Sequence, residues 1–306
     1  MTTSVEKTEG SIYSPLMEGE ITRLALQSRL TRNADMIPVN ELKKSFQSKK
    51  VVYILDVGCG YGMVARDRFK DWDNIFVVGI DFQEGVLEKA RKLNSDVDNF
   101  VFEQANIDSV EFDTRLEEIE KKYNIENGFD IVFCAYVVQH ISDPIKFLTK
   151  CRNHISDDGY IFLRNTADKS TISYGDDGLI KEIQDLSELA PGTASRDLGM
   201  QLHHHLYVSG YNNIQVYGWL KNTSNLSVEE RMNIFRERFS WRSMYFKTAL
   251  DKDPDNEELR SKYEWMVNAL NRLEEIFKEP AFWYGETILN VVARKQALTI
   301  TNEYWR

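Results

Sequence analysis

The amino-acid sequence predicts an α/β protein built on a doubly wound, mostly parallel sheet. The first observation is a strand–turn–helix pattern over residues 51–62, where an apolar run ends in closely spaced glycines. The second is that further apolar runs, each followed by a helical pattern, recur at roughly 25-residue intervals as far as Arg164. Alternating strands and helices of this kind form a parallel sheet with right-handed crossovers. Ligands of such sheets bind at the carboxyl ends of the strands.

The first of these units runs from Val51 to Gly62 and reads V-V-Y-I-L-D-V-G-C-G-Y-G. Its apolar part is typical of a strand buried on both faces. Glycine accepts the positive φ of a tight turn into the helix that follows, which we expect to end near Phe69. The free N–H groups at the start of that helix favour polar or anionic ligand atoms. This turn therefore predicts a site for a nucleotide-like cofactor.

The glycine spacing narrows the class of cofactor. A dinucleotide fingerprint needs G-x-G-x-x-G, but the pattern here is G-x-G-x-G, with Met63 where the fingerprint has its last glycine. A phosphate-binding P-loop needs a lysine directly after its glycines, and none follows here. The spacing thus disfavours both nicotinamide cofactors and nucleoside triphosphates. An acid, Asp56, stands two residues ahead of the first glycine.

A second apolar run, residues 75–80, ends in Asp81. A carboxylate at this strand end could accept hydrogen bonds from both hydroxyls of a ribose. The alternative is that Asp81 only caps the helix predicted over residues 84–93. Its place immediately after a strand favours the ribose role.

Three more strands complete the repeating part of the chain, over residues 100–103, 129–134 and 160–164. Asn106 follows the first of them and Ala135 follows the second. Because parallel strands end at the same edge of a sheet, we expect these residues to gather with Gly58 and Asp81. Asp143 before Pro144 predicts a helix start.

The segments around this sheet are additions to it. Helices are predicted over residues 15–30 and 39–47, where they either pack on the sheet or form a lid over the active site. A polar loop over 165–195 precedes a helix over 196–209 and a strand over 211–220. The pair Arg196-Asp197 is either a helix-start ion pair or an anchor for a substrate carboxylate.

About 60 residues separate that strand from the last one, predicted over Trp283 to Arg294. Ser227 and Glu230 form a capping box at the start of this insertion. Asp253-Pro254 predicts the start of a second helix, and its apolar stripe predicts an antiparallel helix pair. The stripe consists of Leu259, Tyr263, Met266, Leu270, Leu273 and Phe277. It either packs against the core, or caps the acceptor pocket, or forms the surface of a homodimer.

Composition excludes several classes of function. The net charge of −10 disfavours nucleic acid as a partner. No apolar run is long enough for a transmembrane helix, and the first thirty residues lack the apolar core of a signal peptide. Three cysteines without metal-type spacing predict a reducing cytoplasm. We expect no metal site, because His203, His204 and His205 are consecutive and point apart on a helix.

From Lys50 to about Arg164 the chain resembles the class I S-adenosylmethionine-dependent methyltransferases. The D-x-G-x-G-x-G form, the acid at Asp81, the strand end at Ala105-Asn106 and the pattern F-D-x-V followed by H-x-x-D-P carry the resemblance. The family usually has an acid where this chain has Asn106, so the contact to adenine falls to Asn106 or to Asp108. The resemblance implies a seven-stranded Rossmann-like sheet, and a cofactor site formed by Asp56, Gly58, Cys59, Gly60, Gly62, Asp81, Phe82, Ala105, Asn106, Ile107 and Ala135.

The resemblance also implies the domain organisation and the reaction. We expect an N-terminal helical lid (1–48), a core (49–220), a helical insertion (221–281) and a last strand with a tail (282–306). The reaction is methyl transfer from S-adenosylmethionine to nitrogen or oxygen of a small-molecule acceptor, with His140, Tyr136 and Tyr13 as candidate catalytic residues. The alternatives are a protein or tRNA methyltransferase, and a non-catalytic cofactor-binding subunit.

Overall fold

The structure is a computed structural model, and it describes residues 19–191 and 194–295. The chain divides into two compact units. Unit 1 takes in the described residues up to Thr31 together with Ala167–Asp197 and Trp219–Ile288. Unit 2 takes in the described residues of Arg32–Thr166, Leu198–Gly218 and the chain from Leu289 on.

Unit 2 contains the predicted parallel sheet. Five parallel strands stand in the order β3-β2-β1-β4-β5, and β8 follows antiparallel to β5. This order reverses direction at β1, as a doubly wound sheet requires. The strands are β1 (Val52–Val57), β2 (Ile75–Asp81), β3 (Phe100–Gln104), β4 (Phe129–Ala135), β5 (Ile155–Asn165), β7 (Asn212–Asn222), which pairs with β8, and β8 (Trp283–Arg294).

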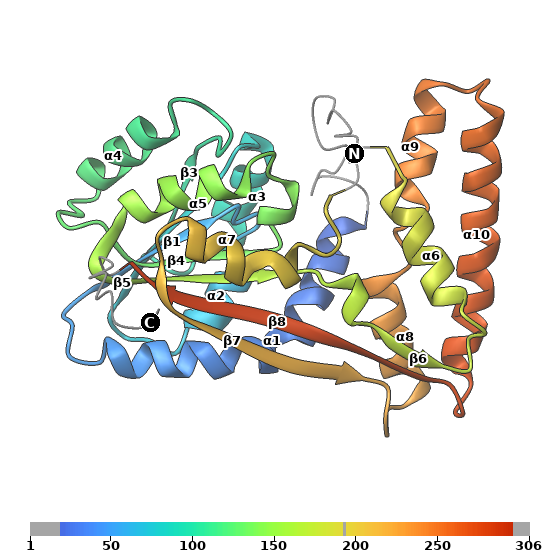
Figure 1. The fold of residues 1–306 in the computed structure, drawn as a ribbon. Helices are drawn as coiled ribbons and strands as arrows, with labels where there is room; N and C mark the ends of the chain where they lie inside the picture. Colours follow the sequence, from blue (N-terminus) through green and yellow to red (C-terminus); the bar gives the residue numbers. More distant parts are fainter. Residues whose placement is uncertain (1–18, 192–193, 296–306) are drawn as a thin grey trace, which may run out of the picture. The chain divides into compact units, whose positions relative to one another are not determined.

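Helices cover both faces of this sheet, because its apolar strands are buried on both sides. One core contains residues of α4 (Phe112–Lys122), α5 (Pro144–Asn153) and α7 (Leu202–Val208), which Figure 1 shows together on one face. The other core contains residues of α1 (Glu20–Ser45), α2 (Met63–Phe69) and α3 (Glu84–Leu93). The prediction of a doubly wound α/β sheet is confirmed.

Unit 1 is mainly helical and has a core of its own. Its helices are α6 (Leu179–Glu188), α8 (Val228–Arg238), α9 (Met244–Lys252) and α10 (Glu257–Lys278), and Figure 1 shows them grouped together. A short strand, β6 (Ile172–Tyr174), pairs antiparallel with the first residues of β8. The predicted apolar stripe packs within this core, with Met266 and Leu273 fully buried and Leu259 partly buried. A homodimer through the insertion stays a prediction.

Several local predictions are confirmed by the elements. Helix α3 has the predicted bounds, and α5 starts where predicted: the Asp143 side chain accepts a hydrogen bond from the N–H of Lys146, with Pro144 in the first turn. The capping box of Ser227 and Glu230 is present at the start of α8.

Other predictions differ from the structure. The N-terminal segment forms one helix, α1, with Pro38 inside it, instead of two short helices. Helix α10 begins at Glu257 because the Asn256 side chain caps it, so the start predicted at Asp253-Pro254 is wrong. Helix α4 was not predicted. Over the described residues the sheet has eight strands rather than seven, since β6 forms within the stretch predicted as a loop.

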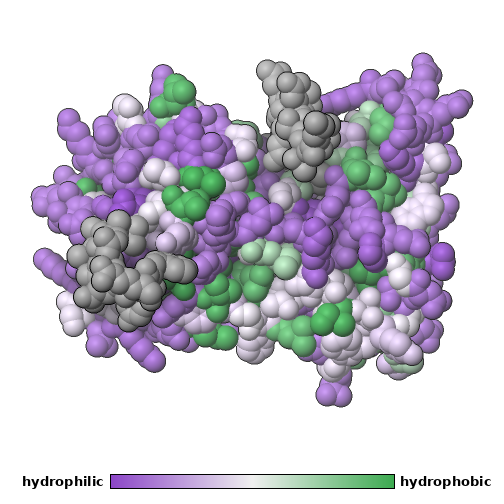
Figure 2. Space-filling model, in the orientation of Figure 1, coloured by the Kyte–Doolittle hydropathy of each residue, from purple (hydrophilic) through white to green (hydrophobic). Residues whose placement is uncertain are grey.

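Within the described part of the chain, no helix is both long and apolar enough to cross a membrane. On the face drawn in Figure 2, hydrophilic residues predominate and hydrophobic ones are scattered. This distribution agrees with a formal net charge of −10.

Candidate cofactor site

The glycine turn after β1 has the backbone that its sequence predicts. Gly58, Gly60 and Gly62 all have positive φ, between 52° and 71°. A side chain at Gly58 would lie 2.4 Å from Cγ2 of Val137, so only glycine fits there. At Gly60 no atom lies within 4 Å of the position that a Cβ would take. The turn is therefore closed at its first glycine and open at its second, where a ligand could approach the backbone.

Hydrogen bonds join this turn to the ends of the two neighbouring strands. The N–H of Gly60 donates to Oδ2 of Asp81 at 3.2 Å, and the N–H of Gln83 donates to Oδ1 at 3.0 Å. The N–H of Ala105 donates to the backbone carbonyl of Asp81 at 3.0 Å. The ends of β1, β2 and β3 thus converge on Asp81, as the parallel register predicts.

Two carboxyl groups are buried in this turn. Asp56 is 4% exposed and Asp81 is 8% exposed. Burial and, to a smaller extent, nearby Asp81 raise the pKa of Asp56 to about 8, and Arg164 opposes the shift. Burial also raises the pKa of Asp81, against the hydrogen bonds from Gln83 and Gly60. Among the residues that the structure describes, no hydrogen bond to the Asp56 carboxyl group is found.

This chemistry fits S-adenosylmethionine, which carries a sulfonium and an ammonium group beside a ribose. Buried carboxyl groups without cationic hydrogen-bond partners are suited to cationic ligand atoms. The Phe82 ring follows Asp81 and is 59% exposed, so an apolar face is available to a base. Cys59 is buried, and burial raises the pKa of its thiol well above the usual value, so it is a neutral packing group.

The other predicted cofactor residues follow β3 and β4. Ala105 is buried, Ile107 packs against the core, and Ala135 is partly buried at the end of β4. Asn106 is exposed, and its Oδ1 accepts a hydrogen bond from the N–H of Asp108 at 3.0 Å. The amide oxygen of Asn106 is thus already engaged locally, although an oxygen can accept a second bond.

The candidate catalytic residues also follow β4. Tyr136 has φ of 62°, its N–H donates to the carbonyl of Arg164 at 2.7 Å, and its ring lies 4.6 Å from the guanidinium carbon of Arg164. His140 closes the short 3-10 helix Val138–His140 and is partly buried. Tyr13 lies outside the described residues. The positive φ of Tyr136 places a non-glycine residue in the left-handed region, where the backbone is strained. Such strain is concentrated at functional sites.

The sequence analysis missed a buried ionic group in unit 2. Asp35 of α1 accepts hydrogen bonds from Nε of Arg68 at 2.7 Å, from Arg164 and from Nδ2 of Asn290 at 3.2 Å. Asp35, Arg68 and Arg164 are all fully buried. The sequence hinted at this group only through Arg164, an arginine that ends the apolar run of residues 160–164. Asp35 thereby joins α1 to the end of β5, next to Tyr136.

The side chains of the three consecutive histidines do not converge on one point. His203 and His204 are exposed on α7, and the rings of His204 and His205 stand 6.1 Å apart. Within residues 19–191 and 194–295, no group of three or more His, Cys, Asp or Glu side chains could hold a metal ion. The prediction of an ion pair between Arg196 and Asp197 is wrong. Asp197 pairs with Lys169 at 2.9 Å, and Arg196 pairs with Asp168 at 3.5 Å.

The fold is that of a doubly wound α/β protein, and the turn after β1 is a candidate ligand site at its strand ends. The chain belongs to the methyltransferase domain family, whose model matches residues 48–237. This match covers more than half of the chain and confirms the resemblance to class I S-adenosylmethionine-dependent methyltransferases.

Curated relatives agree with this assignment, and a solved structure shares the fold. The chain is 32% identical over 122 residues to a ubiquinone biosynthesis O-methyltransferase of Neisseria meningitidis, covering 40% of this chain and 46% of that protein. It is 31% identical over 134 residues to the enzyme of that name from Hydrogenovibrio crunogenus, covering 44% and 50%. The chain thus spans about half the length of these relatives. The YcgJ protein of Bacillus subtilis shares the fold, with a TM-score of 0.51 at 17% identity over 85% of this chain and 98% of that one.

Proposed function

We propose that this protein is an enzyme that transfers a methyl group from S-adenosylmethionine to nitrogen or oxygen of a small-molecule acceptor. The observation that carries the proposal is the pair of buried carboxyl groups, Asp56 and Asp81, at the open glycine turn. Membership of the methyltransferase domain family supports it. The relatives named as ubiquinone biosynthesis O-methyltransferases support an acceptor that is a small molecule.

Each part of the turn has a proposed role toward the cofactor. Asp81 accepts hydrogen bonds from the ribose hydroxyls, and Asp56 faces the cationic amino-acid end. Phe82 and the segment Ala105–Ile107 border the adenine, where either Asn106 or Asp108 accepts from its amino group. Cys59, Gly62 and Ala135 complete the walls of the site. The bound cofactor supplies an electrophilic methyl group on a neutral leaving group, so alignment and exclusion of water contribute much of the rate.

We propose Tyr136 and His140 as the residues that face the acceptor, with Tyr13 as a third candidate. The strained backbone of Tyr136 and its ring contact with Arg164 fix the direction of the phenol. A hydroxyl or imidazole beside the acceptor can take up a proton as the acceptor attacks. We further propose a reducing cytoplasm as the site of action, since Cys59, Cys134 and Cys151 are free buried thiols.

The test is methyl transfer from radiolabelled S-adenosylmethionine to three panels of acceptors: small phenols and amines, tRNA, and protein. The proposal expects label in the small-molecule panel, and a loss of rate in Tyr136→Phe or His140→Gln without loss of cofactor binding. Label found only in tRNA or only in protein would support the alternative acceptors. Cofactor binding without transfer to any panel would favour a non-catalytic subunit.

A further inference from the structure

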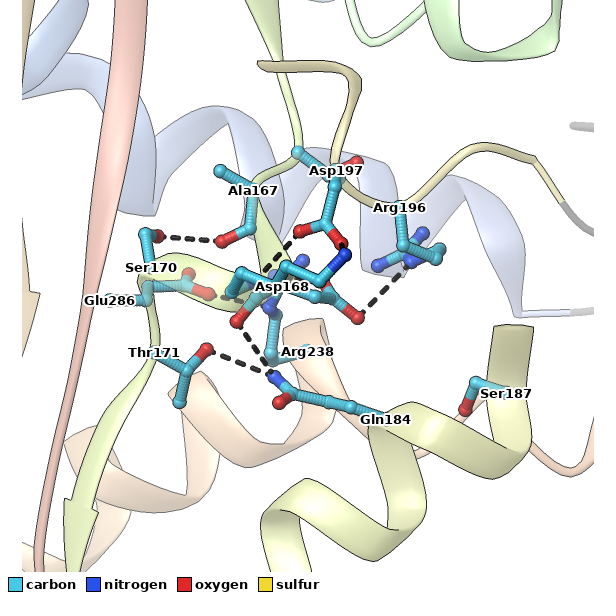
Figure 3. A network of polar contacts seen from close by, with 12 residues as sticks. Ala167, Asp168, Ser170, Thr171, Gln184, Ser187, Arg196, Asp197, Arg238 and Glu286 are labelled. Carbon is cyan, nitrogen blue, oxygen red and sulfur yellow. Dashed lines mark hydrogen bonds and ion pairs between the residues drawn. The ribbon is translucent and has the colours of Figure 1, made fainter. Parts of the chain in front are cut away.

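Unit 1 contains a buried cluster of charged side chains that the sequence did not predict. At its centre, Asp168 accepts hydrogen bonds from Nη2 of Arg238 at 2.5 Å and from Nη2 of Arg242 at 2.8 Å. Nε of Arg196 lies 3.5 Å from the same carboxylate, and Figure 3 shows Asp168 between Arg196 and Arg238. Because these side chains pair with one another, the cluster has a structural role within unit 1.

A smaller buried network lies in unit 2 and includes a candidate catalytic residue. The hydroxyl of Thr166 donates a hydrogen bond to Oε1 of Gln139 at 2.8 Å. Nε2 of Gln139 lies 3.1 Å from Nε2 of His140. Thr166 and Gln139 are each 6% exposed, whereas His140 is only partly buried. Two enclosed side chains thus lead to one that is partly accessible.

The backbone fixes the position of this network. Gln139 and His140 belong to the 3-10 helix that follows β4, and Thr166 follows β5, which is the parallel neighbour of β4. The carbonyl of Thr166 accepts a hydrogen bond from the N–H of Gly199 at 2.7 Å. A side chain at Gly199 would lie 2.6 Å from this oxygen, so only glycine allows so close an approach. The network is therefore anchored at the ends of two neighbouring strands.

The hydrogen-bond inventory of these three side chains determines where the protons lie. Within residues 19–191 and 194–295, the one acceptor that the Thr166 hydroxyl reaches is Oε1 of Gln139. Turning the amide round would leave the buried hydroxyl hydrogen without an acceptor, which is costly. The N–H of Gln139 therefore points to Nε2 of His140, and a ring nitrogen accepts only when it carries no proton. The ring proton of neutral His140 accordingly lies on Nδ1.

We propose that Thr166 and Gln139 are positioning residues that hold His140 in the Nδ1–H tautomer, so that its ring offers a hydrogen-bond donor to the methyl acceptor. This inference rests on the proposed function, because it takes His140 to face the acceptor. The lone pair of Nε2 is engaged by Gln139, so the ring has no free basic nitrogen for the acceptor. His140 thus orients the attacking atom and does not take up its proton.

A donor at this position favours oxygen over nitrogen as the attacking atom. A hydroxyl oxygen has two lone pairs, so one can accept from Nδ1–H of His140 while the other attacks. An amine nitrogen has a single lone pair and cannot do both. The proton of the acceptor hydroxyl passes to water, and the oxygen gains the methyl group in its place while the sulfur keeps the electron pair. A phenol, whose hydroxyl is acidic, fits this arrangement best.

The test reads the tautomer of His140 directly, in the full chain without an acceptor. The histidine rings are isotope-labelled, and long-range proton–nitrogen correlation spectra are recorded at about pH 8.5, where an ordinary imidazole is neutral. The chain has five histidines, so comparison with His140→Gln identifies the signals of His140. We expect Nδ1 of His140 to carry the proton. A proton on Nε2 would overturn the proposal.

Variants of Thr166 separate positioning from a merely structural role. Thr166→Val removes the hydroxyl, so the amide of Gln139 can turn round and His140 should populate both tautomers. Thr166→Ser keeps a hydroxyl and should restore the Nδ1–H tautomer. Thr149→Val removes a hydroxyl that donates to a carbonyl on the exposed side of α5, and as the control it should leave His140 unchanged. An Nδ1–H tautomer that persists in Thr166→Val would contradict the role of Thr166, and the wild-type spectrum decides where that variant does not fold.

Activity measurements separate this inference from the proposed function. With a phenol that is methylated in the small-molecule panel, Thr166→Val should lower kcat/KM about two- to tenfold, the change expected for one hydrogen bond. Its affinity for S-adenosylhomocysteine should stay unchanged, and Thr166→Ser should keep the wild-type rate. Label that enters amines but not phenols would overturn the donor role of His140. Absence of transfer to every panel would overturn the proposed function alone, because the tautomer is read without an acceptor.

Discussion

The backbone N–H of Gly60 donates a hydrogen bond to Oδ2 of Asp81 at a distance of 3.2 Å. The other oxygen of this carboxylate accepts from the N–H of Gln83 at 3.0 Å. The acid proposed to hold the ribose is thus oriented by two loops before any ligand arrives. Such preorganisation reduces the entropy lost when a ligand binds.

The glycines of the turn should differ in what an added methyl group does. Gly58→Ala combines a positive φ with a clash against Val137, whereas Gly60→Ala meets no atom within 4 Å. We expect Gly60→Ala to lower the free energy of unfolding by only about 1–2 kcal/mol, which is the cost of a left-handed backbone for a residue with a side chain. Gly58→Ala should lower the free energy of unfolding clearly more. Thermal unfolding of both variants checks this order, and a less stable Gly60→Ala would contradict the described turn.

Asp56 should make the stability of the ligand-free protein depend on pH. Its pKa rises from 3.8 to about 8, so its stabilising contribution is complete below pH 3.8 and is lost as the pH rises through about 8. Asp56→Asn cannot titrate, so the unfolding temperature of the wild type should fall relative to that of Asp56→Asn between about pH 4 and pH 8, and the two should run parallel above that range.

The measurement is the unfolding temperature of both proteins across this range, with Asp73→Asn, at an exposed position, as the control. Titration of all other groups cancels in the difference. Curves for the wild type and Asp56→Asn that run parallel would show that Asp56 ionises normally.

The charged cluster of unit 1 should be sensitive to its central acid. Asp168→Asn leaves Arg196, Arg238 and Arg242 without their shared carboxylate, and breaking a buried ionic network costs about 3–5 kcal/mol. Asp185→Asn removes the same charge from an exposed pair with Lys181 and should change the stability by less than about 1 kcal/mol. Urea unfolding measures both, and equal effects would contradict the buried network.

Asp35 should be needed for the stability of unit 2. Asp35→Asn removes the charge that pairs with Arg68 and Arg164, at a cost of about 3–5 kcal/mol because all three side chains are buried. Asp67→Asn, at a position whose side chain is 31% exposed, is the control and should cost much less. Urea unfolding of the two variants compares them, and an Asp35→Asn variant as stable as Asp67→Asn would contradict the ionic link between α1 and β5.

The sheet could be predicted from the sequence because its signals are local. Each signal determines the structure of its own segment. The apolar run from Val51 forms β1, the glycines lead into α2, and Asp143-Pro144 starts α5. Helix α4 was missed because it follows β3 after a short polar stretch and its apolar positions are Phe112, Leu116 and Ile119 among acids and lysines.

The charged clusters could not be predicted for a different reason. Asp35 meets Arg164 across 129 residues, and Asp168 meets Arg242 across 74. Sequence spacing carries no signal for such pairs, since only the folded chain joins them. The pair Arg196-Asp197 was a natural expectation, but neighbouring side chains point in different directions and each found another partner. Strand β6 consists of three residues, which is too short for a periodic pattern.

The central claim is that the turn after β1 and the acid Asp81 hold S-adenosylmethionine, and calorimetric titration with S-adenosylhomocysteine tests it most directly. We predict that the wild type binds this ligand and that Asp81→Ala binds it at least about tenfold more weakly, because hydrogen bonds to a charged acceptor are lost. Asp96→Ala, which removes an exposed acid paired with Arg66, should bind like the wild type. No binding to the wild type, or equal affinity in Asp81→Ala, would contradict the account.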